Sequence, residues 1–121
     1  MEPNNQIALN LLVLPSKNLD ETAAFYNKLG ITFDRHRHGT DLKPGPEHLA
    51  AELTGCVLEF YPATTTPIQP IRIGLKVPNL DATIASFQGA PEAILSPPKP
   101  TPWGRRAILK DPDGHKIELS E

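Results

Sequence analysis

The chain has 121 residues, with 12 basic and 14 acidic side chains and a formal net charge of −2. This balance argues against general nucleic-acid binding, which needs a basic surface to neutralise phosphates. The single cysteine, Cys56, excludes an intrachain disulfide and a four-cysteine zinc site. No apolar run approaches the roughly 20 residues that a membrane span needs, and no secretory signal is recognisable at the start. We therefore expect one cytoplasmic domain over residues 1–121, with no membrane partner.

The first half of the chain predicts a strand, a helix and three more strands. The apolar run Ile7–Leu14 is short and rich in branched side chains, which is typical of a strand. Asn18, with Glu21 three residues later, forms a capping box and predicts a helix that ends near Gly30. Further strands are expected at about residues 32–38, 48–53 and 56–61, with a tight turn at 54–55.

The second half predicts the same order of elements. A strand is expected over Arg72–Val77, and Asn79 caps a helix that ends near Gly89. A short strand near Glu92–Leu95 precedes a hairpin formed by residues 105–110 and 115–120. The hairpin turn, Asp111–Gly114, has proline second and glycine fourth, which is typical of a type I turn.

Fourteen prolines gather mainly in three clusters. Proline has no backbone N–H and so removes a hydrogen bond from a central strand, which predicts that these clusters lie between elements. The clusters are Pro44 with Pro46, then Pro62, Pro67 and Pro70, then Pro97, Pro98, Pro100 and Pro102.

The two halves repeat each other. The segment Asn18–Thr22 recurs 61 residues later as Asn79–Thr83, and Val57–Phe60 aligns with Lys116–Leu119 at an offset of 59. The repeat predicts two βαβββ modules, at about residues 7–61 and 70–119.

With these segments the chain resembles the glyoxalase / bleomycin-resistance / extradiol-dioxygenase superfamily, also called vicinal oxygen chelate proteins. The resemblance rests on Asn18–Gly30, Ile73–Asp81 and, most specifically, Pro102–Leu119, and it covers about Ile7–Leu119. It implies an α+β fold in which two βαβββ modules form a curved mixed sheet around a shared cleft. The same fold hosts many reactions and also proteins without any, so it does not by itself assign an activity.

The resemblance also implies where a metal would bind. Metal-dependent members take two ligands from the first strands of their modules and two glutamates from near the module ends, and Glu59 and Glu118 match these glutamates. The second-module histidine is replaced by Arg72, which offers only donors and cannot be a ligand. At the first-strand position, alternation favours Asn10 on the cleft face, with Leu9, Leu11 and Val13 packing on the helices, but a two-residue slip would put Ala8 there.

His48 is the best substitute imidazole, because its strand is expected beside the one that carries Glu59. A lone strand histidine is nevertheless more often a surface or hydrogen-bonded residue than a ligand. If His48 is a ligand, then His48, Glu59 and Glu118 could together hold a divalent ion such as nickel, zinc, manganese or iron. The competing interpretation makes both glutamates ion-pair partners of Arg72 or Arg105.

Other side chains are candidates for ligand contact. Arg72 could bind an anionic group through a bidentate contact. Trp103 either walls the cleft or anchors its loop, and Tyr61 alternates with Glu59 and could line the cleft. Arg105 and Arg106 alternate, so one of them is expected to face the cleft, and Arg105 is the one that we predict to contact a ligand.

These residues support more than one function. We expect a glyoxalase/bleomycin-resistance-like small-molecule protein, either a metal-dependent lyase or isomerase acting on vicinal oxygens, with Glu59 or Glu118 moving the proton. The alternative is a metal-free protein that binds or sequesters a small molecule, which the missing histidines favour. A module that binds a partner protein is a third reading, though no residue selects it. By resemblance we expect a homodimer.

Overall fold

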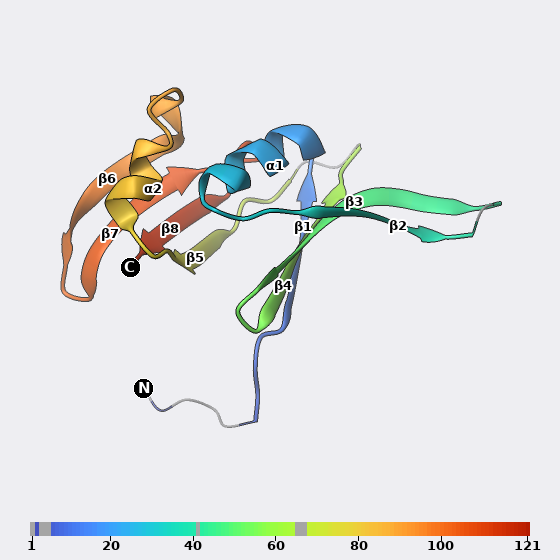
Figure 1. Ribbon diagram of the computed structural model, residues 1–121, viewed down its shortest axis with the longest axis horizontal. Helices are drawn as coiled ribbons and strands as arrows, with labels where there is room; N and C mark the ends of the chain where they lie inside the picture. The colour runs from blue at the N-terminus through green and yellow to red at the C-terminus, as the bar shows by residue number, and fades with distance from the viewer. Residues whose placement is uncertain (1, 3–5, 41, 65–67) are drawn as a thin grey trace.

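The computed structural model describes residues 2, 6–40, 42–64 and 68–121. No helix in these ranges is long and apolar enough to cross a membrane. The first module contains β1 (Leu11–Ser16), α1 (Leu19–Lys28), β2 (Asp34–Gly39), β3 (Pro44–Leu53) and β4 (Cys56–Pro62) (Figure 1). The second contains β5 (Arg72–Lys76), α2 (Leu80–Ala85), the 3-10 turn η1 (Pro91–Ala93), β6 (Ile94–Thr101), β7 (Gly104–Lys110) and β8 (Lys116–Ser120).

Each module forms its own four-stranded mixed sheet, in the order β1-β4-β3-β2 or β5-β8-β7-β6. In both sheets the first strand runs parallel to the last, and the other pairs are antiparallel. The predicted α+β fold with two similar βαβββ modules is thus confirmed, with two sheets rather than one continuous curved sheet.

Both helices begin at an asparagine, as predicted. The Asn18 side chain accepts a hydrogen bond from the Glu21 N–H at 3.1 Å, and Asn79 accepts one from the Ala82 N–H at 3.0 Å. Each cap satisfies one of the N–H groups that a helix start leaves without an intrahelical partner. The second helix is shorter than predicted, since α2 ends at Ala85.

Strand β1 differs from its prediction in position and in facing. It begins at Leu11, opposite Val57 at the start of β4, so the residues before it have no strand to pair with. Leu14 and Ser16 are buried, whereas Leu11 and Val13 are 48% and 46% exposed. The expectation that Leu11 and Val13 pack against the helices is therefore wrong. The strand is apolar on both faces, so the alternation of its side chains does not indicate which face is buried.

Several prolines lie inside strands, contrary to prediction. Pro46 is in β3, which pairs with β4 only from Leu49 onward, so this part of β3 has β2 on one side and no strand on the other. Pro97, Pro98 and Pro100 lie in β6, the edge strand of the second sheet, where the pairing with β7 has two register shifts. An edge strand tolerates proline because one row of its N–H groups has no ladder partner. Pro67 lies outside the described residues.

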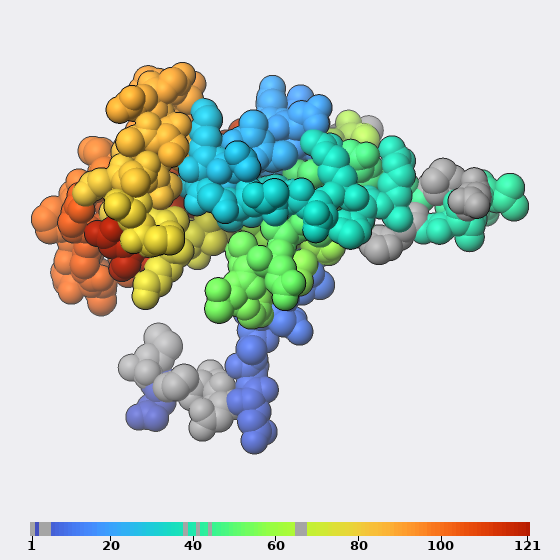
Figure 2. All heavy atoms as spheres, viewed as in Figure 1, coloured from blue at the N-terminus to red at the C-terminus, as the bar shows by residue number. Residues whose placement is uncertain are grey.

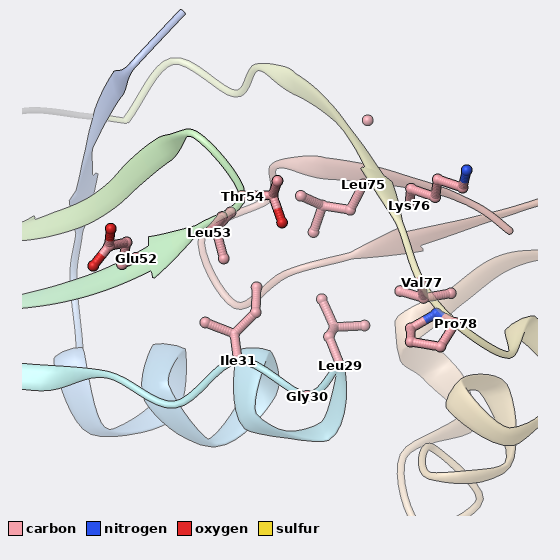
Figure 3. A pocket seen from close by; sticks show the side chains of 11 residues that line it. Leu29, Gly30, Ile31, Glu52, Leu53, Thr54, Leu75, Lys76, Val77 and Pro78 are labelled. Atoms are coloured by element: carbon pink, nitrogen blue, oxygen red, sulfur yellow. The ribbon is translucent and has the colours of Figure 1, made fainter.

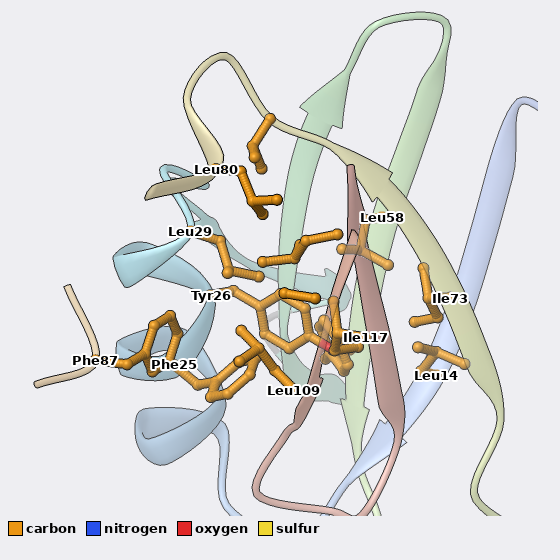
Figure 4. Packing of buried hydrophobic residues seen from close by; sticks show 14 of the residues in the cluster. Leu14, Phe25, Tyr26, Leu29, Leu58, Ile73, Leu80, Phe87, Leu109 and Ile117 are labelled. Carbon is orange, nitrogen blue, oxygen red and sulfur yellow. The ribbon is translucent and has the colours of Figure 1, made fainter. Parts of the chain in front are cut away.

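One hydrophobic core serves both modules. The core-facing sides of the two sheets contribute to a single buried cluster together with both helices (Figure 4). Tyr26 of α1 packs against Phe60 of β4, with ring centroids 5.0 Å apart, and Phe25 meets Phe87 beyond α2 at 5.2 Å. Because one face of each sheet contributes to this shared core, the other face of each sheet points away from it.

A polar cluster fastens the second module to α1. The buried Tyr26 hydroxyl donates to Asp111 Oδ2 at 2.7 Å, and Asp111 Oδ1 accepts from the N–H groups of Asp113 and His115. Asp113 in turn accepts from the Lys17 N–H at 2.9 Å. Burial and the neighbouring Asp111 carboxylate both raise the pKa of Tyr26, which therefore stays a hydroxyl donor. The predicted type I turn is thus also a contact between modules.

The outline of the molecule has two projections. The β2–β3 hairpin extends beyond the rest of the chain, and the segment just before β1 runs away from the body (Figure 2). In that segment Ile7 and Leu9 are 78% and 73% exposed, and they continue the row of Leu11 and Val13 along β1.

Candidate functional site

The outer side of the first sheet brings several predicted residues together. We call this side the module-one face. Alternation along β4 puts Glu59 and Tyr61 on it, and the register places Val13 beside Glu59 and His36 opposite His48. His48 lies in β3, one residue before Leu49, the partner of Phe60. Its imidazole therefore lies beside Tyr61 of the neighbouring strand, on the same face of the sheet.

An aromatic stack forms at this point. The rings of His48 and Tyr61 are nearly parallel, at an interplanar angle of 6° and a centroid distance of 4.2 Å. His36 stacks on His48 at 5.8 Å and 28°. His48 is 1% exposed, and its Nε2 lies 3.4 Å from Glu59 Oε2. The module-one face thus offers a rigid planar group next to a carboxylate, an arrangement suited to flat aromatic ligands.

The outer side of the second sheet, which we call the module-two face, has different chemistry. Glu118 of β8 accepts from Arg72 Nε of β5 at 2.8 Å through one oxygen and from Arg106 Nη1 of β7 at 2.6 Å through the other. These two guanidinium groups, Arg106 foremost, hold the pKa of Glu118 below its ordinary value. Glu118 is therefore an ionised carboxylate with a cation on each oxygen.

These surroundings do not suit a divalent metal. Both Glu118 oxygens are occupied by arginines, whose positive charge opposes a second cation beside them. Among the described residues, no group of three or more histidine, cysteine, aspartate or glutamate side chains could hold a metal ion. His48 and Glu59 are neighbours, but Glu118 is on the other sheet. The expected His48–Glu59–Glu118 set is thus not assembled within one chain.

Three further predicted residues lie away from these contacts. Arg105 forms a bidentate ion pair with Asp81 of α2, at 3.1 and 2.8 Å. Trp103 is 79% exposed in the turn between β6 and β7, so it is not packed beneath the prolines of its loop. Asn10 precedes β1, is exposed, and uses its carbonyl oxygen to accept the Val57 N–H at 2.8 Å.

Arg106, rather than the predicted Arg105, is the arginine that contacts Glu118. The turn fixes the hairpin register, in which Lys110 pairs with Lys116, Ile108 with Glu118, and Arg106 with Ser120. Counting back from the turn therefore puts Arg106, not Arg105, on the same face as Glu118. The Asp111–Gly114 turn motif in the sequence was therefore sufficient to predict which of the two arginines faces Glu118.

The modules also enclose a cavity of about 710 Å³ (Figure 3). It lies between the end of α1, the β3–β4 turn and the stretch from Gly74 to Pro78, and its walls are mostly apolar, with Glu52 and Lys76 as charged members. None of the predicted site residues lines it. The cavity therefore lies at the junction of the modules, and it borders the module-one face through Glu52 and the module-two face through Lys76.

The match to a family model extends over nearly the whole chain. The model of the Glyoxalase/Bleomycin resistance protein/Dioxygenase superfamily matches residues 8–119. The chain belongs to this superfamily. An uncharacterized protein of Mycolicibacterium smegmatis is 29% identical over 114 residues, which cover 90% of this chain and 89% of that protein.

Solved structures of the superfamily have the same fold. A glyoxalase/bleomycin resistance protein from a Streptomyces species is 26% identical, with a TM-score of 0.69 over 94% of this chain and 100% of that one. A bleomycin resistance determinant encoded on transposon Tn5 is 24% identical, with a TM-score of 0.64 over 93% and 96%. A bleomycin-binding protein in complex with bleomycin is 23% identical, with a TM-score of 0.63 over 94% and 97%.

Proposed function

We propose that this superfamily member binds a small molecule without using a metal ion. The observation that carries the proposal is the environment of Glu118, whose two oxygens are held by Arg72 and Arg106. A carboxylate in this position serves to orient guanidinium groups rather than to ligate a cation. The Tyr61 ring, held flat by stacking on the buried His48, supplies the contact surface that an aromatic ligand needs.

The site we propose is completed by a second copy of the chain. The two faces lie on opposite sides of the shared core, so one chain offers two half-sites that do not meet. The module-one face carries the carboxylates of Asp34, Glu52 and Glu59, whereas the module-two face is basic, and such opposite charges favour pairing. A homodimer that brings the two faces together would also cover the exposed apolar row that ends at Leu11 and Val13.

The first test is calorimetric titration with bleomycin, the ligand named for one structural neighbour. We expect binding that Tyr61→Ala weakens at least tenfold, because loss of a stacked ring removes about 1.4 kcal/mol or more. Ser86→Ala, an exposed change at the end of α2, is the matched control. If neither bleomycin nor a panel of planar aromatic compounds binds, the proposal fails.

Light scattering tests the dimer. We expect twice the chain mass for the wild type and a shift toward monomer for the double variant Leu11→Lys/Val13→Lys, which places charge in the apolar row. A wild-type protein that stays monomeric at high micromolar concentration would remove the dimer from the proposal.

A metal-dependent lyase or isomerase is the second candidate, and the His48–Glu59 contact is the observation that favours it. Mass spectrometry of protein dialysed separately against nickel, zinc, manganese and iron discriminates the two. About one retained metal per chain, lost in both His48→Ala and Glu59→Ala, would support the enzyme and contradict the metal-free proposal. No retained metal in the wild type supports binding without chemistry.

A further inference from the structure

The module-two face concentrates positive charge in a chain that is acidic overall. The strand register sets alternate residues of β5, β8 and β7 on this face, with Arg72 beside Lys116 and Lys116 beside Lys110. Beside Lys99 of the edge strand β6, which pairs with Arg106, these three strands place one carboxylate, that of Glu118, among five cationic side chains. These cations are Arg72, Lys76, Arg106, Lys110 and Lys116.

The two arginines retain hydrogen-bonding capacity beyond Glu118. Arg72 bonds Glu118 through Nε, and its terminal nitrogens have no acceptor among the described residues; its side chain is 54% exposed. Arg106 bonds Glu118 through Nη1, while its buried Nε has no acceptor in the described part of the chain. A buried N–H without an acceptor is unfavourable, so an incoming oxygen ligand would be stabilised there.

The arrangement already holds one carboxylate in place. Glu118 lies between Arg72 and Arg106, and its lowered pKa keeps it charged. A guanidinium group binds planar oxyanions in a bidentate manner, and the surrounding lysines add a net attraction for negative groups. Glu118 thus occupies the acceptor position that an external anion could share or take.

We propose that the module-two face binds an anionic group, a carboxylate or a phosphate, on the small-molecule ligand, and that Glu118 is an internal counter-ion at this subsite. This inference rests on the proposed small-molecule binding and specifies its ligand class. Arg72 and Arg106 bind the oxyanion, and Lys116 adds charge from the same face. Glu118 keeps the two guanidinium groups aligned between binding events and competes with the ligand for them.

This competition predicts the direction in which anion affinity changes when the Glu118 charge is removed. Removal of the Glu118 charge frees both guanidinium groups and raises the local positive charge, so anion affinity increases. A purely structural ion pair predicts no such gain. We expect Glu118→Gln to bind anions about three- to tenfold more tightly, and Arg72→Gln and Arg106→Gln to bind them about tenfold more weakly, since charge-assisted hydrogen bonds contribute about 1.5–3 kcal/mol.

The experiment is an NMR titration of the arginine Nε–H signals with inorganic phosphate and, separately, with benzoate. Arg35→Gln is the matched control, because Arg35 also bridges two carboxylates, Asp20 and Glu47, but lies away from this face. Its anion affinity should equal that of the wild type. Melting curves identify any variant that fails to fold. If Arg106→Gln is unfolded, Arg72→Gln alone tests the contribution of the arginines.

The outcomes separate the anion subsite from the proposed function. Stronger binding of phosphate or benzoate to Glu118→Gln, with loss in the arginine variants, supports the subsite and tells which oxyanion it prefers. Equal affinity in Glu118→Gln and wild type overturns it. Benzoate binding that depends on Tyr61 but is insensitive to Arg72→Gln and Arg106→Gln also overturns it, while leaving the proposed function intact. An oligonucleotide that binds through Arg106 when neither small anion does would overturn it too.

Discussion

Two glutamates at equivalent positions of the repeat have acquired different chemistry. Glu59 on the module-one face lies beside His48 and near a stacked tyrosine, whereas Glu118 on the module-two face is held by Arg72 and Arg106. Backbone geometry is the same in both modules, since each glutamate lies on the last strand, between the parallel first strand and an antiparallel neighbour. The fold thus places a carboxylate at the same position in both sheets, while the side chains on the neighbouring strands determine its chemistry.

The largest expected effect comes from breaking the core that separates the two faces. Tyr26→Phe removes the donor to Asp111 Oδ2 and leaves a buried carboxylate oxygen without it. We expect a loss of about 1–3 kcal/mol in the free energy of unfolding, measured by urea denaturation with circular dichroism. Tyr61→Phe, the same change on the module-one face, should stay within about 0.5 kcal/mol.

A single cooperative transition is expected in both tyrosine variants, because one core serves both modules. If Tyr26→Phe instead unfolds in two steps, the modules are independent and the faces are not two sides of one unit.

The arginine clamp on Glu118 predicts a difference in acid stability. A carboxyl whose pKa is lowered on folding stabilises the protein above its unfolded pKa of about 4.3, and this contribution is lost as the pH falls through the lower folded pKa. Wild type should therefore be more stable than Glu118→Gln at pH 7, and the two should converge below about pH 4. Thermal melts across this range measure the difference.

The double variant Arg72→Gln/Arg106→Gln supplies the control for that experiment. In this background the carboxylate has lost both partners, so adding Glu118→Gln should no longer alter the acid dependence. If Glu118→Gln alters the acid dependence of stability as much in this background as in the wild type, the two arginines are not the cause of that dependence.

A smaller effect compares the two helix starts. Asn18 and Asn79 have nearly the same backbone angles and accept equivalent hydrogen bonds. Replacing either by alanine should lower the free energy of unfolding by about 1 kcal/mol. A helix cap that can be removed without shifting the melting curve would contradict its assignment.

The smallest effect is expected in the β6–β7 turn. Trp103 is largely exposed in the β6–β7 turn, so Trp103→Phe should change the free energy of unfolding by no more than about 0.5 kcal/mol. The wild-type tryptophan emission should be that of an indole in water. A blue-shifted emission in the dimer would place Trp103 in an interface.

The sequence predicts the fold well where the signal is local. The capping asparagines and the Asp111–Gly114 turn depend on neighbours along the chain, and the structure has both. The facing of β1 was not predictable in this way, because Ile7–Leu14 is apolar at nearly every position. Only packing against the core selects which side of such a strand is buried.

The candidate site was predictable in part for the same reason. Glu59, Tyr61 and His48 share a face because strand alternation and one hairpin turn relate them. The association of Glu118 with both Arg72 and Arg106 depends on the order of three strands, two of them far apart in sequence. The pairing of β5 with β8 has no local signature, whereas the hairpin register, counted from the Asp111–Gly114 turn, does separate Arg106 from Arg105.

The shared core also bears on how such a chain can change over time. A lone module would lose the core contacts that join the halves, such as that between Phe25 and Phe87, so a half-length version would have to associate with another copy to fold. The present chain contains that association covalently. Mutations at core positions in one half must fit the other half, whereas residues on the outer faces have no such counterpart. Duplicated halves can therefore drift apart in charge, one acidic and one basic, without losing the architecture that joins them.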